Sequence, residues 1–477
     1  MVQAQGDRFE VVAAGGAGSG PRRAGRGAFG RVLSPAAALV VLWWAAWWPA
    51  GCGGDDAAAD ADVSGETDVD GGADADADGD ADADVSEDIE AGEGLDADVS
   101  EDADAVGDDG GDVPVPPMNA LVVLTSDYAT GGVSVIDLDT VGAAPAVVVD
   151  AAPAHGDAML ACGSAAGGAG ERVFHVVERL GSDRVRRFRV TATGVEEAGG
   201  FELEDGTNPQ DAIPLSVGQW AVPLYERNAL LFLAGDLSGV AETVDLAALA
   251  FGADGLCEMH RGVEWSGRLY VSLQELDRSG TWWTPEGPGL LAVIRLSAGG
   301  GHELIDVRPG TAGLQALELS GANPVGPMRV VGDGSSARML VATVGAYGAN
   351  DGGLEAVDDP DAETSAGFVV TEEDLGGDIG DWVVLEGGVG FAVVTVGFSE
   401  DRVMRFDAAA GRVESEPLVV SGGYTLSALA DAGDERLAVA DRTAGSAGVR
   451  LFDVRTGEEL TAAPIAVGLP PAGLCRP

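Results

Sequence analysis

The feature that most constrains the fold is a short strand pattern that recurs along residues 118–477. Each copy is an apolar, β-branched run that ends in polar residues and is followed by a turn and a second run. Successive copies begin 52, 48, 48, 70, 53 and 45 residues apart, which is the period of a four-stranded propeller blade. The copies are 119–126, 171–178, 219–225, 267–273, 337–344, 390–397 and 435–441. Residues 118–477 are therefore predicted to be all-β, a single β-propeller with seven four-stranded blades.

The two ends of this region are predicted to share one blade. The first unit lacks an innermost strand, whereas the chain ends in an extra strand-like run at 472–476. Pairing of this run with the strand at 119–126 would close the ring and remove the exposed sheet edges.

Three cysteines, Cys162, Cys257 and Cys475, fall on the expected innermost strands. Close-packed blades accommodate small buried side chains, so free buried thiols are the default expectation. The alternative is a disulfide between Cys162 and Cys475, which would lock the ring shut in an oxidising compartment.

The amino-terminal 51 residues read as an export signal. Several arginines precede an apolar run at 32–48, which is only 17 residues long and contains Pro35, whereas spanning a membrane takes about 20. Residues 49–52, Pro-Ala-Gly-Cys, resemble the lipobox of bacterial lipoproteins, although Pro49 stands where an aliphatic residue is usual. The resemblance implies a lipid on Cys52 and a place in the cell envelope of a Gram-negative-type bacterium, at the outer membrane or cell surface. The alternative is an uncleaved anchor with a spare cysteine.

Residues 52–117 are predicted to be a disordered acidic tether. Residues 53–117 carry 25 acidic groups and no basic ones, within a chain of net charge -52. So few large apolar residues cannot offset the entropy of folding. The strong negative charge also argues against nucleic acid as a partner.

One part of the tether matches the start of a calcium-binding loop. Asp74, Asp76 and Asp78 alternate before Gly79 as in an EF-hand, but the twelfth position, which needs a bidentate Glu, is Val85. Loose counterion condensation is therefore favoured over a specific metal site.

The repeats resemble a known group, the seven-bladed propellers of the YncE-like and surface-layer type. The segment Gly-Val-Ser-Val-Ile-Asp at 132–137 fits the first half of that repeat, and 449–457 with 465–473 fits the whole. With Cys52 and the acidic tether, the chain is also similar to the lipoprotein sets of myxobacteria. The resemblance implies architecture and says little about a ligand.

The loops after the second strand of each blade are enriched in aromatic and charged residues, which predicts a binding face. For the adjacent Trp282 and Trp283, the alternative is that both indoles cap the blade below. Acid-Arg dipeptides recur at the same loops, and ion pairs between hairpins are favoured for them over a ligand-gripping rim. The predicted face comprises Tyr128, Tyr225, Arg278, Trp282, Trp283, Tyr347, Asp351, Phe398 and Asp441.

The sequence offers little for catalysis. Its four histidines show no metal-ligand spacing, and no nucleophile elbow or phosphate loop is present. His155 and His260 lie near expected innermost strands. The sequence therefore predicts a lipid-anchored monomer that presents the propeller as a binding or scaffold module for a protein, peptide or glycan, without a cofactor. The alternative is a lactonase-like hydrolase or cofactor-dependent oxidoreductase acting at the channel mouth.

Overall fold

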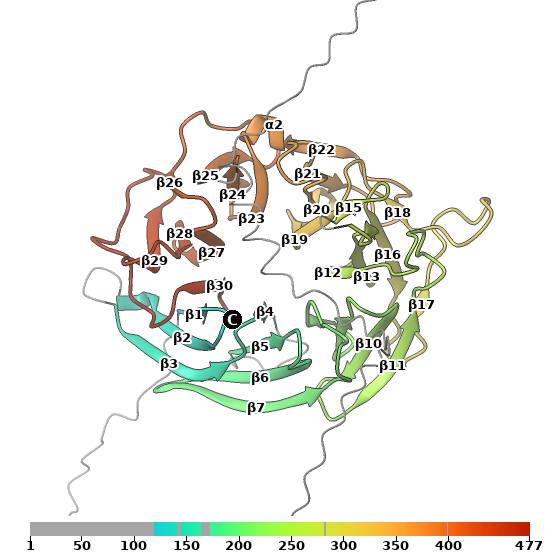
Figure 1. Ribbon diagram of the computed structural model, residues 1–477, viewed down its shortest axis with the longest axis horizontal. Helices are drawn as coiled ribbons and strands as arrows, with labels where there is room; N and C mark the ends of the chain where they lie inside the picture. Colours follow the sequence, from blue (N-terminus) through green and yellow to red (C-terminus); the bar gives the residue numbers. More distant parts are fainter. Residues whose placement is uncertain (1–118, 141–144, 164–171, 281–282, 398) are drawn as a thin grey trace, which may run out of the picture. The chain divides into compact units, whose positions relative to one another are not determined.

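A computed structural model describes residues 119–140, 145–163, 172–280, 283–397 and 399–477, which form one ring of seven small antiparallel sheets (Figure 1). The prediction of an all-β, seven-bladed propeller is confirmed. The chain passes around the ring from blade 1, in cyan, to blade 7, in red, which lies beside blade 1. Cys52, the acidic segment 53–117 and the EF-hand-like Asp74, Asp76 and Asp78 lie outside the described residues.

The strands of the first four blades are given from the axis outward. Blade 1 contains β30 (Pro471–Cys475), β1 (Ala120–Ser126), β2 (Gly131–Asp137) and β3 (Val147–Ala154). Blade 2 contains β4 (Ala158–Cys162), β5 (Val173–Glu178), β6 (Arg184–Thr191) and β7 (Gly194–Glu202). Blade 3 contains β8 (Ile213–Pro214), β9 (Gln219–Pro223), β10 (Ala229–Ala234) and β11 (Val240–Asp245). Blade 4 contains β12 (Met259–Trp265), β13 (Arg268–Leu273), β16 (Leu290–Arg295) and the short β17 (Glu303–Leu304) and β18 (Leu317–Glu318).

The last three blades follow the same order. Blade 5 contains β19 (Pro324–Val331), β20 (Arg338–Thr343), β21 (Gly353–Val357) and β22 (Gly367–Thr371). Blade 6 contains β23 (Asp378–Val384), β24 (Val389–Val396), β25 (Glu400–Asp407) and β26 (Val419–Gly422). Blade 7 contains β27 (Leu426–Gly433), β28 (Arg436–Asp441) and β29 (Gly448–Asp453), with isolated bridges to Glu459 and Ile465 at its outer edge.

Seven apolar clusters, one between each pair of neighbouring blades, form the core. Strand β1 serves two of them, because Val122 and Leu124 pack toward blade 2 whereas Leu121 and Val123 pack toward blade 7. A sheet covered on both faces needs apolar side chains at successive positions. This is why the second strands stand out in the sequence as continuous apolar runs.

The ring closes through the carboxyl-terminal strand. β30 pairs antiparallel with β1, with Val122 opposite Cys475 and Leu124 opposite Gly473. A disulfide joins Cys475 to Cys162 on β4 of blade 2, with the two Cα atoms 5.9 Å apart. Cys257 is a buried free thiol that lies just before β12. The closure predicted from 472–476 is thus confirmed, and its final strand is covalently tied to the next blade.

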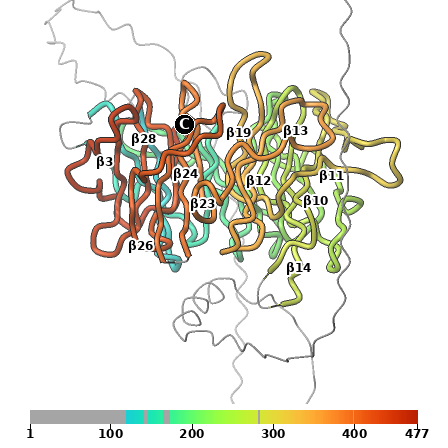
Figure 2. Tube along the Cα trace, turned by 90° about the horizontal axis from the view of Figure 1, so that it is seen from above, coloured from blue at the N-terminus to red at the C-terminus, as the bar shows by residue number. Residues whose placement is uncertain are grey.

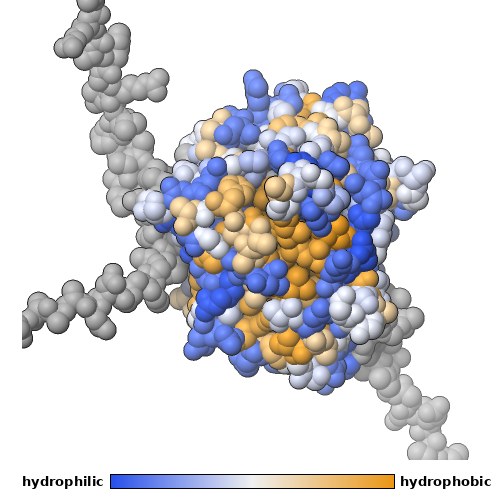
Figure 3. All heavy atoms as spheres, turned by 90° about the vertical axis from the view of Figure 1, so that its right-hand side faces the viewer, coloured by the Kyte–Doolittle hydropathy of each residue, from blue (hydrophilic) through white to orange (hydrophobic). Residues whose placement is uncertain are grey.

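Blade 4 departs most from the regular pattern, which accounts for the 70-residue spacing in the sequence. A two-stranded hairpin, β14 (Leu276–Asp277) with β15 (Thr284–Pro285), is inserted between β13 and β16. The outer edge of β16 is covered only by β17 and β18, which are two residues long. On this side of the ring, Figure 3 shows apolar residues framed by polar ones.

Helical structure among the described residues is limited to short turns: η1 (Leu138–Thr140), η2 (Gly334–Ser336) and α2 (Glu372–Leu375). Within those residues, no helix has the length and apolar character needed to cross a bilayer.

Candidate functional site

The loops predicted to bind a ligand share one face of the ring. This face carries the turns between the second and third strands of each blade and the connections that lead into the next blade. The inserted hairpin belongs to it, and β14 projects from the lower side of the ring in Figure 2. Trp282 and Phe398 lie outside the described residues. The other seven predicted residues lie on this face, spread over several blades.

Three of the predicted residues meet beside the inserted hairpin. The rings of Tyr225 and Trp283 lie nearly parallel, 6.4 Å apart between centroids. The Arg278 guanidinium lies 4.4 Å from the Trp283 ring centroid and 5.6 Å from that of Tyr225, and it forms a 2.9 Å ion pair with Glu226. Tyr225 is only 2% exposed. These contacts within the protein fasten the insertion to blade 3, and they occupy the aromatic faces that a ligand would need.

The remaining predicted residues are divided between exposed aromatics and loop-ordering acids. Tyr128 and Tyr347 are 48% and 45% exposed, and Arg442 lies over the Tyr128 ring at 4.4 Å. Asp351 accepts a hydrogen bond from the Ala346 amide within its own loop. Asp441 is buried and accepts one from the Thr443 amide. The two carboxylates therefore shape their loops, and the two tyrosines are exposed aromatic side chains on this face.

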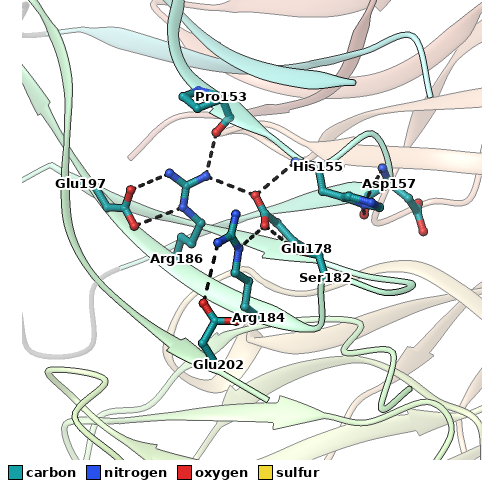
Figure 4. Close-up of polar contacts among 9 residues, drawn as sticks. All are labelled: Pro153, His155, Asp157, Glu178, Ser182, Arg184, Arg186, Glu197 and Glu202. Carbon is teal, nitrogen blue, oxygen red and sulfur yellow. Dashed lines mark hydrogen bonds and ion pairs between the residues drawn. The ribbon is translucent and has the colours of Figure 1, made fainter. Parts of the chain in front are cut away.

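The carboxylate of Glu178, at the end of β5, is fully buried and fully bonded (Figure 4). One oxygen accepts from the His155 amide and from Arg186, and the other accepts from Ser182 and from the Arg184 Nε. Burial alone would raise the pKa of Glu178, but the hydrogen bonds from Arg184, Ser182 and Arg186 outweigh it and hold the pKa below its ordinary value. This carboxylate joins the loop of blade 1 to the third strand of blade 2.

Buried acids of the same kind recur around this face. Glu355 accepts from the Ser320 and Gly321 amides, and Asp401 accepts from those of Thr425 and Leu426. Each of these acids holds the loop that leads into the innermost strand of its own or the next blade. Glu178, Glu355 and Asp401 therefore hold loops together and are not free to bind a ligand.

Two further buried acids hold the insertion of blade 4. Burial raises the pKa of Glu258 to about 8 and that of Glu275 to about 7. Glu275 accepts hydrogen bonds from the Phe251 and Gly252 amides, and Glu258 accepts one from the Leu276 amide. At neutral pH both groups are therefore largely or partly protonated, which suits an uncharged role in loop packing.

A different arrangement appears at the axis, where most innermost strands carry a β-bulge near this face. The pairing register shifts between Met259 and Gly262 on β12, and comparable shifts interrupt β19, β23, β27 and the pairing of β30. A bulge leaves extra residues unpaired and redirects their side chains, and bulges are common beside functional sites. On β12 the bulged residues are His260 and Arg261.

A polar network crosses blades 2, 3 and 4 at this end of the axis. Arg179 donates to the Gln210 side chain at 2.9 Å and forms an ion pair with Asp157. Arg261 donates to the Gln210 carbonyl at 3.2 Å and lies 3.7 Å from Asp211. The five side chains are each at least partly buried. Three blades thus contribute charged groups to one small region.

Blades 5 and 6 contribute Arg329 on β19 and Asp381 on β23. Within the described ranges, no carboxylate oxygen lies within the 4.0 Å ion-pair distance of Arg329. Its guanidinium lies 5.8 Å from the Trp382 ring centroid. Burial lowers the pKa of Arg329, while Asp381 and Asp431 oppose the shift from a greater distance. Arg329 is therefore a charged group at the axis without a direct ion-pair partner in the described chain.

The axis also collects buried polar atoms that lack hydrogen-bond partners among the described residues. They are Asp157 Oδ2, Arg179 Nε, His260 Nδ1, Arg261 Nε and Arg329 Nε. Burial also lowers the pKa of His260 well below its ordinary value, so its ring is neutral at pH 7. Buried polar groups without partners are uncommon in folded proteins and often indicate a missing water, ion or ligand. The axial end of this face is therefore the strongest candidate site.

The two histidines singled out in the sequence differ in their surroundings. The His155 Nδ1 lies 3.2 Å from the Asp157 amide nitrogen and 3.3 Å from the Asp157 carbonyl oxygen, so it accepts from the first or donates to the second according to its tautomer. His260 lies within the axial group. In the part of the chain that the structure describes, no three His, Cys, Asp or Glu side chains are placed to hold a metal ion.

Sequence reasoning missed most of the axial group. Arg261, Arg329 and Asp381 lie in three separate segments of the sequence and form no recognisable motif. A charged residue on an expected innermost strand could have indicated the site, because its side chain can face only the axis or a neighbouring blade.

Comparison with known proteins supports the fold alone. No family model matches the chain, and no curated protein is significantly similar to it. Among solved structures, the periplasmic gluconolactonase PpgL of Pseudomonas aeruginosa has a TM-score of 0.51 and 15% identity, covering 75% of this chain and 98% of that one. A putative 6-phosphogluconolactonase from Bacteroides fragilis has a TM-score of 0.49 and 12% identity, covering 75% and 97%. AztD of Citrobacter koseri has a TM-score of 0.45 and 12% identity, covering 74% and 96%.

At these identities the likeness extends to architecture and not to activity. The finer resemblances, to YncE-like propellers and to lipoproteins, stay predictions. The chain is thus a seven-bladed β-propeller whose polar axial end is its most distinctive chemical feature.

Proposed function

We propose that the protein is a binding module of the cell envelope and that its ligand sits at the axial end of the loop-bearing face. The observation that carries the proposal is the group of five buried polar atoms without partners, contributed by blades 2, 4 and 5 and the connection from blade 1. A ligand reaching this group would also meet the loop-bearing face on which Tyr128 and Tyr347 are exposed. That surface suits a small molecule or the end of a peptide or glycan.

The test is a thermal-shift screen of metabolites, including sugars, sugar acids, amino acids and short peptides, followed by calorimetry on the hits. Gly380 offers a steric probe, because it is exposed at the bulge of β23 and a Cβ added there would meet only ordinary contacts, the nearest at 3.8 Å. We expect Gly380→Trp to weaken binding of a hit at least tenfold. The matched control is Gly299→Trp on an exposed outer loop of blade 4, where an added Cβ meets nothing within 4 Å.

Retention of full affinity by Gly380→Trp, or equal loss in Gly299→Trp, would place the ligand elsewhere and contradict the proposal. A complete screen without any hit would contradict it as well.

We further propose that a lipid on Cys52 and the acidic segment 53–117 hold the propeller at a membrane surface. The proposal is supported by the lipobox-like residues 49–52 and by the absence of basic residues in that segment. Two or more acyl chains would anchor a protein stably. In its native host, wild-type protein should fractionate with membranes and carry the added mass of acyl chains on a terminal Cys52. Cys52→Ala should be soluble and unacylated, and membrane association of that variant would refute the anchor.

Hydrolysis at the axis is the second candidate function. It is favoured by one observation, the neutral imidazole of His260 beside two arginines whose positive charges reach it. A neutral imidazole can accept a proton, and guanidinium groups can stabilise an oxyanion. Including sugar lactones in the same screen and following acid release would distinguish an enzyme from a binder.

A further inference from the structure

The acidic and basic side chains at the axis differ in which of their atoms have hydrogen-bond partners. The acids take hydrogen bonds from the backbone: Asp211 from the Ala212 and Gly262 amides, and Asp381 from the Leu429 amide. These contacts join blade 3 to blade 4 and blade 6 to blade 7. Asp211 and Asp381 therefore have a structural role, because their carboxylates bind the backbone of a neighbouring blade.

The arginines keep unused donors. The Nε groups of Arg179, Arg261 and Arg329 are buried and have no acceptor in the described chain. Burial lowers the pKa of Arg261, with smaller contributions from the charges of Arg179 and Arg329, while Asp211 and Asp381 oppose the shift. Asp157 and Asp211 offset part of the charge of Arg179 and Arg261, but a buried Nε donor without an acceptor still carries a desolvation cost that an oxyanion would relieve. Three guanidinium donors at the axis therefore lack an acceptor, whereas Asp157 Oδ2 is the one axial carboxylate oxygen, among the described residues, that is buried without a donor.

We propose that Arg179, Arg261 and Arg329 bind a carboxylate or phosphate group of the axial ligand, an inference that rests on the proposed function. The planar guanidinium group matches the geometry of both oxyanions and forms charge-assisted hydrogen bonds with them. The neutral ring of His260 adds one further polar atom without a partner.

The surrounding charge restricts the ligand further. Residues 118–477 contain far more acidic than basic side chains, within a chain of net charge -52. Such a field opposes the approach of polyanions, whereas a small molecule with one or two negative charges can reach the unpartnered guanidinium donors at the axis. The ligand class is therefore a small organic acid or phosphomonoester, and nucleic acid is excluded.

The experiment is calorimetric titration of the purified protein with succinate and with inorganic phosphate, using glucose and sodium chloride of matched ionic strength as controls. We expect succinate or phosphate to bind and neither control to do so. Arg261→Met and Arg329→Met should each weaken binding roughly 10- to 100-fold, the range for a lost hydrogen bond to a charged group. Arg295→Met is the matched control, because Arg295 is 58% exposed on blade 4 and pairs with Glu303, and its affinity should stay within about twofold of wild type.

Stability measurements separate loss of binding from loss of fold. Since Arg329 has no direct ion-pair partner, Arg329→Met should melt no lower than the wild-type protein without ligand. Absence of binding by both anions, or unchanged affinity in Arg329→Met, would overturn the proposal.

The outcome also distinguishes this inference from the proposed function. A neutral or cationic hit that Gly380→Trp blocks and Arg329→Met leaves unaffected would preserve an axial binding site and refute the oxyanion assignment. No binding of any class at the axis would refute both.

Discussion

Replacing Cys475 with serine should lower the free energy of unfolding by about 5 kcal/mol, the largest single effect that we expect. The disulfide to Cys162 spans 313 residues of sequence, and the chain-entropy model gives roughly this value for so long a loop. The bond also holds β30 in the blade that it shares with β1, so its loss weakens the closure of the ring. Urea unfolding of the oxidised wild type and of Cys475→Ser measures the difference.

Reduction provides the internal control for this effect. A thiol reductant should lower the unfolding midpoint of the wild type to that of Cys475→Ser and leave the variant unchanged. Cys257→Ala removes a thiol that is not part of the bridge, so it should keep the full response to reductant. A wild type with the same midpoint in oxidising and reducing conditions would show that the bridge contributes nothing to stability.

Glu178→Ala should cost about 3–5 kcal/mol, because it removes the carboxylate and leaves two arginines without their buried partner. The loss includes hydrogen bonds from Arg184, Arg186, Ser182 and the His155 amide (Figure 4). The matched control is Glu202→Ala, whose side chain is 75% exposed and lies 3.7 Å from Arg184. A surface pair of this kind contributes less than about 1 kcal/mol.

The free energy of unfolding lost in Glu178→Ala should depend on pH in one direction. The pKa of Glu178 is below its ordinary value of 4.5 in the folded state, so its contribution is fully present above pH 4.5. It is lost as the pH falls through the folded pKa. The difference between wild type and Glu178→Ala should therefore be constant from pH 6 to 8 and should narrow in acid. A difference that grows below pH 4.5 would contradict this assignment.

Much of the fold could be predicted because the second strands are buried on both faces. In β1 the successive apolar residues from Leu121 to Leu124 fill two different inter-blade clusters, and such runs are conspicuous in a sequence. The closing strand was predictable because one unit had a strand missing and the carboxyl end had one to spare. The β-bulges of the innermost strands could not be predicted. A shift in pairing register depends on both paired strands, and the sequence of one strand alone does not show it.

The candidate site was predicted less well than the fold, for a related reason. The sequence places Tyr225, Arg278 and Trp283 on neighbouring loops, but it does not show that the arginine packs against both rings. Likewise, Arg261 and Arg329 are 68 residues apart and come together only because β12 and β19 are adjacent innermost strands (Figure 1). Contacts between side chains of different blades form only when the ring closes, so the sequence alone does not show them.

The position of β1 has a mechanical consequence. Polypeptide preceding Asn119 joins the ring at a strand that is paired on both sides, with β2 and with β30. Tension applied from that direction must shear two ladders together, and the bridge from β30 passes part of it to blade 2. An outer strand such as β3, paired on one side only, would instead peel away one hydrogen bond at a time. A force applied to the propeller from its amino-terminal side is therefore borne by a strand that is paired on both sides.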